Sequence, residues 1–184
     1  MPEWYVALLR GINVGRGNRV SMADLRDLFA ELGCSGVSTL LNSGNVIFTA
    51  PGTGPAEMAS RIEAALAARL GLSVRVIVVS AAELATAFNE NPLLGAASDP
   101  SRLFVSFLGP SADRRLLEPL LQQDWSPEIL ALGGRVAYMW CPAGSIESRL
   151  APAAAKVLGE TVTTRNWATV LKLHTLLNSG EPQP

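Results

Sequence analysis

One short segment of the sequence holds many of the residue types that proteins use to bind ligands. The run RGINVGRGNR, residues 10–19, contains three glycines, two asparagines and three arginines. Glycine lets the backbone approach a ligand closely, and arginine supplies fixed hydrogen-bond donors that suit phosphate and carboxylate groups. No Asp or Glu lies between Trp4 and Ala23, so this positive charge has no neighbouring acid in the sequence. We refer to residues 10–20 as the glycine–arginine loop.

The elements expected around this loop bring a second segment next to it. Their order, strand-helix-strand-strand-helix-strand, is that of a ferredoxin-like fold. In such a fold the first hairpin strand runs parallel to strand one, and the second hairpin strand lies antiparallel between them. The loop and the hairpin turn 42–45 then share one end of the sheet. The expected elements are a strand over 4–9, a helix over 21–32, strands over 37–41 and 46–49, a helix from Pro55 and a strand over 74–79.

This convergence predicts a site for a small anionic ligand or a nucleotide. Residues 33–56 carry no charge, so nothing in the hairpin neutralises the arginines. The loop lacks the Gly-Lys-Ser/Thr ending of a P-loop. The alternative is a purely structural loop, in which the glycines turn the chain and the asparagines bond to its backbone. In the ligand hypothesis Arg10 and Arg19 supply charge, and Asn13, Asn18, Ser43 and Asn45 orient the ligand.

The rest of the chain predicts an α+β protein in two halves. Capping boxes at Ser21 and Ser80 mark the starts of two helices. Gly33 suits the end of the helix that starts at Ser21, and the helix that starts at Ser80 runs to about Asn89. Glycine turns at 44–46 and 134–136 occupy matching places, which suggests a weak internal duplication; one continuous mixed sheet is the alternative. We expect a ferredoxin-like half over 1–90, a linker over 91–100, and a second α+β half with a C-terminal helix over 101–184. Its expected elements are strands over 103–108, 128–132 and 136–141, helices over 112–122, 145–158 and 165–177, and a frayed tail over 180–184.

A second dense motif, residues 163–167, precedes the last expected helix. Thr164 is expected to cap that helix, and Trp167 to dock it against the second half. In a functional alternative, Arg165 and Asn166 lie in the first helical turn and reach into the loop site. His174, the single histidine, lies on the apolar stripe and is predicted to be partly buried and hydrogen-bonded.

Conventional catalytic and metal sites find little support. One histidine and two cysteines are too few for a zinc site, so we predict no metal and no cofactor. Cys34 and Cys141 are predicted to be reduced, buried thiols; either could be a nucleophile, but no base can be assigned. An enzyme of unknown reaction, in which arginine and amide donors stabilise developing charge, stays open.

Composition limits the classes of partner. The 184 residues have a net charge of −1 and only 17% charged residues, which argues against a general nucleic-acid or membrane-surface binder. An RNA-binding or protein-interaction module is a further hypothesis, although the sheet aromatics Tyr5 and Phe48 are expected to be buried under helices. The lightly charged surface suits either a monomer or a homodimer. The N-terminus lacks a signal-peptide pattern, so we expect a cytoplasmic protein.

Three stretches of this sequence resemble one protein family. They are residues 9–15 with Asn18, residues 43–46, and residues 164–167 with 170–173. The chain resembles domain-of-unknown-function family 1697, small single-chain bacterial proteins. The resemblance implies an α+β fold with a ferredoxin-like first half, and it brings no established activity. Where relatives tend to have Gly then Lys before Asn18, this chain has Arg16 then Gly17, and Ser21 stands where a proline is usual.

Overall fold

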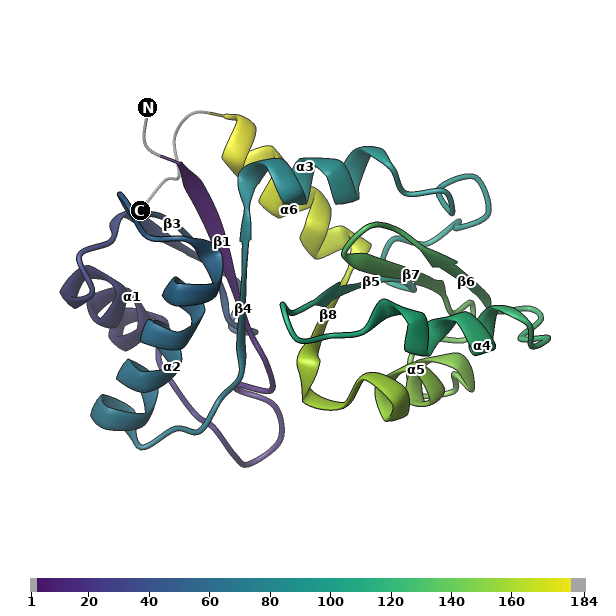
Figure 1. Ribbon diagram of the computed structural model, residues 1–184, viewed down its shortest axis with the longest axis horizontal. Coiled ribbons are helices and arrows are strands. Elements are labelled where there is room, and N and C mark those ends of the chain that lie inside the picture. The colour runs from purple at the N-terminus through teal and green to yellow at the C-terminus, as the bar shows by residue number, and fades with distance from the viewer. Residues whose placement is uncertain (1–2, 180–184) are drawn as a thin grey trace. The chain divides into compact units, whose positions relative to one another are not determined.

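The computed structural model describes residues 3–179, so the predicted tail 180–184 lies outside the described residues. Within this range the chain forms two compact units, the first of residues 3–84 and 173–179, the second of residues 85–172 (Figure 1). The strands are β1 (Trp4–Leu9), β2 (Ser35–Leu40), β3 (Asn45–Thr49), β4 (Val76–Ser80), β5 (Leu103–Leu108), β6 (Ile129–Leu132), β7 (Val136–Trp140) and β8 (Val162–Asn166). The α-helices are α1 (Met22–Glu31), α2 (Pro55–Leu70), α3 (Ala81–Asn89), α4 (Glu118–Leu121), α5 (Leu150–Leu158) and α6 (Trp167–Asn178); η1 (Arg114–Leu117) and η2 (Gly159–Thr161) are short 3-10 helices.

Each unit is built on a four-stranded antiparallel sheet. The order is β2-β3-β1-β4 in the first unit and β6-β7-β5-β8 in the second. β3 pairs antiparallel with both β1 and β2, so the predicted ferredoxin-like order of the first half is confirmed. The second sheet repeats this order strand for strand, which supports an internal duplication. The alternative of one continuous mixed sheet is wrong, because the two sheets are separate.

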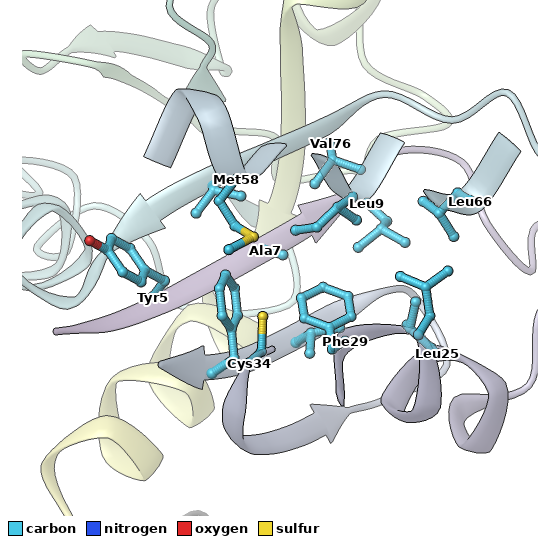
Figure 2. Packing of buried hydrophobic residues seen from close by; sticks show 14 of the residues in the cluster. Tyr5, Ala7, Leu9, Leu25, Phe29, Cys34, Met58, Leu66 and Val76 are labelled. Atoms are coloured by element: carbon cyan, nitrogen blue, oxygen red, sulfur yellow. The ribbon is translucent and has the colours of Figure 1, made fainter. Parts of the chain in front are cut away.

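In the first unit, α1 and α2 cover one face of the sheet. Tyr5, Ala7 and Leu9 point from β1 into a core that also holds Phe29 of α1 and Met58 of α2 (Figure 2). The alternate residues of β1, such as Val6 and Leu8, are also fully buried. Burial on both faces explains why the sequence of β1 is apolar at every position rather than alternating.

The predicted helix signals of the first half are confirmed in detail. Ser21 precedes α1, and its hydroxyl oxygen accepts a hydrogen bond from the Asp24 N–H at 3.0 Å. Ser80 and Glu83 form a reciprocal capping box: the Glu83 N–H donates to Ser80 Oγ, and the Ser80 N–H donates to the Glu83 carboxylate. Gly33 follows α1 with φ of 81°, a left-handed conformation that glycine adopts at low cost.

Two predicted helices of the second half are shorter in the structure. The helix expected over 112–122 is the 3-10 turn η1 followed by the four-residue α4. The helix expected from residue 145 begins only at Leu150, because residues 141–149 form a loop that contains Pro142 and Gly144. The predicted linker 91–100 is an irregular run of turns within the second unit.

The structure also corrects the start of the last helix. Residues 162–166 form β8, which pairs with β5, so Arg165 and Asn166 are not in a helical turn. The β-branched run Val-Thr-Thr favours this extended conformation. Thr164 does not cap α6; its hydroxyl lies 2.8 Å from that of Ser106 on β5. Asn166 takes the capping role instead, because its Oδ1 accepts from the Thr169 N–H at 3.0 Å.

In the second unit, aromatic contacts join the end of α3 to the start of α6 and to β7. Trp167, at the start of α6, is 4% exposed, and its ring stacks on Phe88 with 5.2 Å between centroids. The buried Tyr138 of β7 donates a hydrogen bond to the Ala87 carbonyl at 2.8 Å. The prediction that Trp167 is buried is confirmed, and its stacking partner Phe88 belongs to the second unit, although the sequence predicts a first half over residues 1–90. None of the helices within residues 3–179 is both long and apolar enough to cross a membrane.

Replacing Trp167 with alanine tests the importance of this stack. Trp167→Ala should lower the free energy of unfolding by about 3–5 kcal/mol, because it leaves a cavity beside Phe88. Ile146→Ala is the control, since Ile146 is 94% exposed and should change stability by less than about 0.5 kcal/mol. Urea denaturation followed by far-UV circular dichroism measures both. Equal stability of the two variants would show that the stack is not required.

Candidate functional site

The glycine–arginine loop and the β2–β3 turn meet at one end of the first sheet. The Leu9 N–H donates to the Gly44 carbonyl at 2.9 Å, which continues the β1–β3 ladder into the turn. The side chain of Asn13 donates to the Asn42 carbonyl at 2.8 Å. The Arg10 N–H donates to the Arg75 carbonyl at 2.9 Å, so the start of β4 reaches the same end. The convergence predicted from the strand order is therefore present.

Asn13 holds this end of the sheet together. Its Oδ1 accepts from the Val20 N–H at 3.0 Å, and its Nδ2 donates to the Val20 carbonyl at 2.9 Å. With the bond to Asn42, one amide group joins the start of the loop, its end and the hairpin turn. The Asn13 N–H also donates to the Asn18 carbonyl at 3.0 Å, which closes the loop on itself. The side chain of Asn13 therefore positions the loop and has its donors and acceptor engaged.

The other predicted site residues fall into two groups. Asn45 is fully buried, and its Nδ2 donates to the Leu40 carbonyl and to Ser43 Oγ, so it shapes the turn. Asn18 and Arg19 are exposed on the loop. The Asn18 amide reaches the Gly11 carbonyl at 3.4 Å, and Arg19 donates one bond to the Gly15 carbonyl at 2.5 Å. The guanidinium of Arg19 thus faces solvent with further donors to offer.

The backbone of the loop adds a feature that residue types alone do not reveal. Gly11, Asn13 and Gly15 have φ values of 66°, 53° and 61°, while the two residues between them have negative φ. Alternation in the sign of φ is one feature of backbone nests, in which successive N–H groups converge on an anion. Within residues 3–179, the N–H groups of Val14, Gly15 and Arg16 have no hydrogen-bond partner. The tip of the loop therefore presents backbone donors beside its arginines.

The hairpin turn is shaped to accept the loop closely. A Cβ on Gly44 would lie 2.7 Å from Ile12 Cδ1 and 2.8 Å from Leu9 Cβ, so only glycine fits at this point. Ile12 is 1% exposed and anchors the loop against the turn. Leu41, on the turn, has φ of 58° although it is not a glycine, a conformation that costs free energy and occurs often at binding sites.

Two acids on the elements that adjoin this end of the sheet are engaged elsewhere. Asp24 accepts a hydrogen bond from the Ser21 hydroxyl at 2.7 Å at the start of α1. Glu63 of α2 accepts from the Val76 N–H at 2.8 Å and lies 3.4 Å from the Arg75 guanidinium. These two carboxylates are thus committed to a helix cap and to the start of β4, and the loop keeps its excess of positive charge.

Arg165 and Asn166 belong to the second unit, at the end of β8. Arg165 donates to Thr163 Oγ1 at 3.0 Å and to the Thr164 carbonyl at 2.9 Å. Burial lowers the pKa of its guanidinium to about 10, so it is still charged at neutral pH. Asn166 caps α6 as described above. His174 is half-buried on α6 beside the Asn178 amide, as predicted.

Both cysteines are buried free thiols, as predicted. Burial raises the pKa of the Cys34 thiol, and the positive charge of Arg61 offsets only part of that effect. Burial also raises the pKa of Cys141, whose Sγ lies 3.5 Å from Ser148 Oγ. A raised pKa keeps a thiol protonated and weakly nucleophilic. Within the described range, no three His, Cys, Asp or Glu side chains gather as metal ligands would.

Glu128 forms a hydrogen-bonded cluster with Ser148 that the sequence did not reveal. Its carboxylate accepts from Ser148 Oγ at 2.5 Å and from the N–H groups of Arg149 and Leu150 at 2.9 and 3.0 Å. Burial alone would raise the pKa of Glu128, but these hydrogen bonds and the Arg149 charge together lower it. The carboxylate caps the N-terminus of α5 from just before β6, beside a cavity of about 190 Å³.

The fold and the loop together place the protein in a structural class. It is an α+β protein of two units, each with a four-stranded antiparallel sheet of ferredoxin-like order, and a donor-rich loop at one end of the first sheet. Residues 3–138 match the family described as "Protein of unknown function (DUF1697)", and the chain belongs to this family. The resemblance seen in the sequence is therefore confirmed.

The chain is similar over nearly its whole length to a solved structure. That structure is of the conserved bacterial protein SP0830 from Streptococcus pneumoniae, with 24% sequence identity, a TM-score of 0.80, and coverage of 96% of this chain and 99% of that chain. This similarity shows that the fold is shared. Among curated proteins, no match to the chain was found.

Replacing Gly44 with alanine tests how closely the loop meets the turn. Gly44→Ala should destabilise the protein by roughly 2–5 kcal/mol, because the added Cβ meets Ile12 and Leu9 and φ is positive. Gly52→Ala is the matched control, since Gly52 also has positive φ but nothing lies within 4 Å of an added Cβ. Its cost should be only about 1 kcal/mol. Thermal unfolding measures both, and equal losses would mean that the turn yields to the side chain.

The pKa of Glu128 predicts an acid-dependent contribution to stability. Because the pKa in the folded state lies below the usual 4.5, this contribution is complete above about pH 4.5 and is lost as the pH falls through the lower value. Glu128→Gln should therefore be less stable than the parent near neutral pH, and the difference should shrink in acid. Urea unfolding at a series of pH values measures it, with Glu147→Gln as the exposed control. A difference independent of pH would contradict the role given to the charge.

Proposed function

We propose that the glycine–arginine loop binds a small anionic ligand, such as a phosphate ester or a carboxylate. The observation that carries this proposal is the set of unpartnered N–H groups of Val14, Gly15 and Arg16 at a loop with alternating φ. Backbone donors that have no partner within the protein can bind an anion without first breaking a hydrogen bond.

Arginine side chains supply the charge for this ligand. Arg16 is exposed at the loop tip, and no hydrogen bond or ion pair engages it within the described chain. Arg19 donates only to the Gly15 carbonyl among the described residues, which places its guanidinium over the same part of the loop. Charge-assisted hydrogen bonds from such groups are about twice as strong as neutral ones. Asn13, Asn45 and Ser43 support the loop and the turn rather than contact the ligand.

A nucleotide is the form of anion that best suits the surroundings. Val14 and Leu41 are 68% and 48% exposed, although both are apolar, and they flank the contact between Asn13 and Asn42. A ligand with a flat or apolar part next to its phosphate would cover them. RNA binding by stacking on the first sheet is disfavoured, because Tyr5 and Phe48 are buried in the core under the helices. We place the protein in the cytoplasm, where free thiols such as Cys34 and Cys141 stay reduced.

Calorimetric titration of the full chain with inorganic phosphate and with a nucleoside monophosphate tests the proposal. We expect both to bind, the nucleotide more tightly. Arg16→Ala should weaken phosphate binding about tenfold or more, because one charge-assisted hydrogen bond contributes about 1.5–3 kcal/mol. Arg26→Ala is the matched control, since Arg26 is an exposed arginine on α1 that donates to Thr39.

The contribution of the backbone is tested separately. Gly15→Ala should reduce binding without changing any charge, because φ at this position is positive and the loop must shift. Gly52→Ala, with the same kind of backbone and open surroundings, should bind as the parent does. If neither anion binds a folded parent protein at millimolar concentration, the loop is structural and the proposal is wrong.

A further inference from the structure

β6 forms an outer edge of the second sheet, because it pairs only with β7. The Gly133 N–H donates to the Val136 carbonyl at 2.8 Å, and the register continues from this pair through Ala131 opposite Tyr138 and Ile129 opposite Trp140. Antiparallel strands alternate between bonded and non-bonded pairs, so the backbone N–H and C=O groups of Ile129, Ala131 and Gly133 point toward β7. The N–H and C=O groups of Leu130 and Leu132 must then point to the open side. No hydrogen bond reaches those groups from any other part of residues 3–179.

This edge lacks the usual protection against pairing with another chain. Its sequence, ILAL, has no charge and no proline, and its register over four residues is regular. The corresponding edge strand of the first unit differs: β2 has a bulge between Ser35 and Ser38, and Gly36 there has φ of 61°. A bulge twists an edge away from a partner. The duplicated fold therefore protects the edge at β2 and leaves the edge at β6 open.

Apolar surface lies at the beginning of β6. Leu121 and Ile129 are 42% and 38% exposed, and they line a cleft of about 390 Å³ together with Trp125. The Trp125 indole N–H donates to the Leu120 carbonyl at 2.7 Å, which holds the ring in the wall of this cleft. Exposed apolar residues beside an open strand edge are typical of an interface rather than of a solvated surface.

The charges around β6 select the kind of partner. At the C-terminal end of β6, the Arg114 side chain donates to the Gly133 carbonyl at 2.8 Å, and Arg135 is exposed on the β6–β7 turn. Before its beginning lie Asp124 and Glu128, with Arg149 bound to Glu128 and to the Ser126 carbonyl. One end of the edge is thus basic, and at the other end acids outnumber the base. An identical strand in antiparallel orientation would set the basic end of each copy against the acidic end of the other.

We propose that β6 pairs with β6 of a second copy of this chain, antiparallel about a two-fold axis, to join two sheets into one of eight strands. With the axis at Ala131, Leu130 of each copy lies opposite Leu132 of the other, and each such pair exchanges two backbone hydrogen bonds. Ala131 of one chain lies opposite Ala131 of the other at a non-bonded position, where strands approach most closely and a small side chain fits. The contact is self-complementary, as a two-fold interface requires.

Sedimentation velocity over a range of concentrations tests this pairing. The parent chain should dimerise, and hydrogen exchange at Leu130 and Leu132 should slow as the dimer forms. Leu132→Pro should abolish the dimer, because it removes an outward donor and leaves the bonds to β7 in place. Thr39→Pro is the matched control: the β2–β3 register turns the Thr39 N–H outward on β2, so this proline should leave the dimer intact.

Charge-reversal variants test the same dimer without introducing a proline. Arg114→Glu and Asp124→Arg should each weaken self-association by about tenfold or more, because each places like charges together at both ends of the interface. An equimolar mixture of the two variants should form a heterodimer, since both contacts become attractive. Arg26→Glu should have no effect. A parent chain that stays monomeric, or a dimer indifferent to both Leu132→Pro and the charge reversals, would overturn the proposal.

Discussion

The amide group of Asn13 is the contact on which the candidate site depends. A loop rich in glycine has many conformations, and ordering it costs free energy at every residue. Asn13 offsets part of that cost by bonding both backbone groups of Val20 and the carbonyl of Asn42. The same residue has φ of 53°, which asparagine tolerates better than most residues do. Because Asn13 fixes where the loop begins, ends and meets the turn, the N–H groups at the tip are held in place without being consumed.

Much of the first unit could be predicted from local signals. Ser21 and Ser80 were identified as helix caps, Gly33 as a helix end, and the strand order followed from the order of elements. The helix caps and the helix end depend on residues close in sequence, whose geometry is settled within one turn. The meeting of loop and hairpin could be predicted too, because it follows from topology and not from side-chain detail.

The structure differs from the sequence prediction in the second half where contacts between residues distant in sequence decide the conformation. Local residues do not predict β8, because only Val162, Thr163 and Thr164 favour a strand there and Arg165 and Asn166 resemble the start of a helix. The duplication itself predicts a fourth strand after α5, so the repeat was a better guide than the local residues. The late start of α5 depends on Glu128, which is more than twenty residues away and accepts hydrogen bonds from the Arg149 and Leu150 N–H groups. The site residues divide similarly: residue type indicated the arginines, but only the backbone shows which N–H groups lack partners.

The second unit shows how little of the glycine–arginine loop the fold itself needs. The same connection, from the first strand to the first helical turn, takes residues 10–21 in the first unit and only 109–113 in the second. In the shorter version two backbone donors are used: the Gly109 N–H bonds to the Thr161 carbonyl and the Ala112 N–H to the Gly109 carbonyl, while the Asp113 carboxylate accepts from the Arg115 N–H. One topology is thus closed once by a short turn and once by a longer loop rich in glycine and arginine. Chain connectivity alone accounts for the short version, and the anion binding that we propose would account for the additional residues of the glycine–arginine loop.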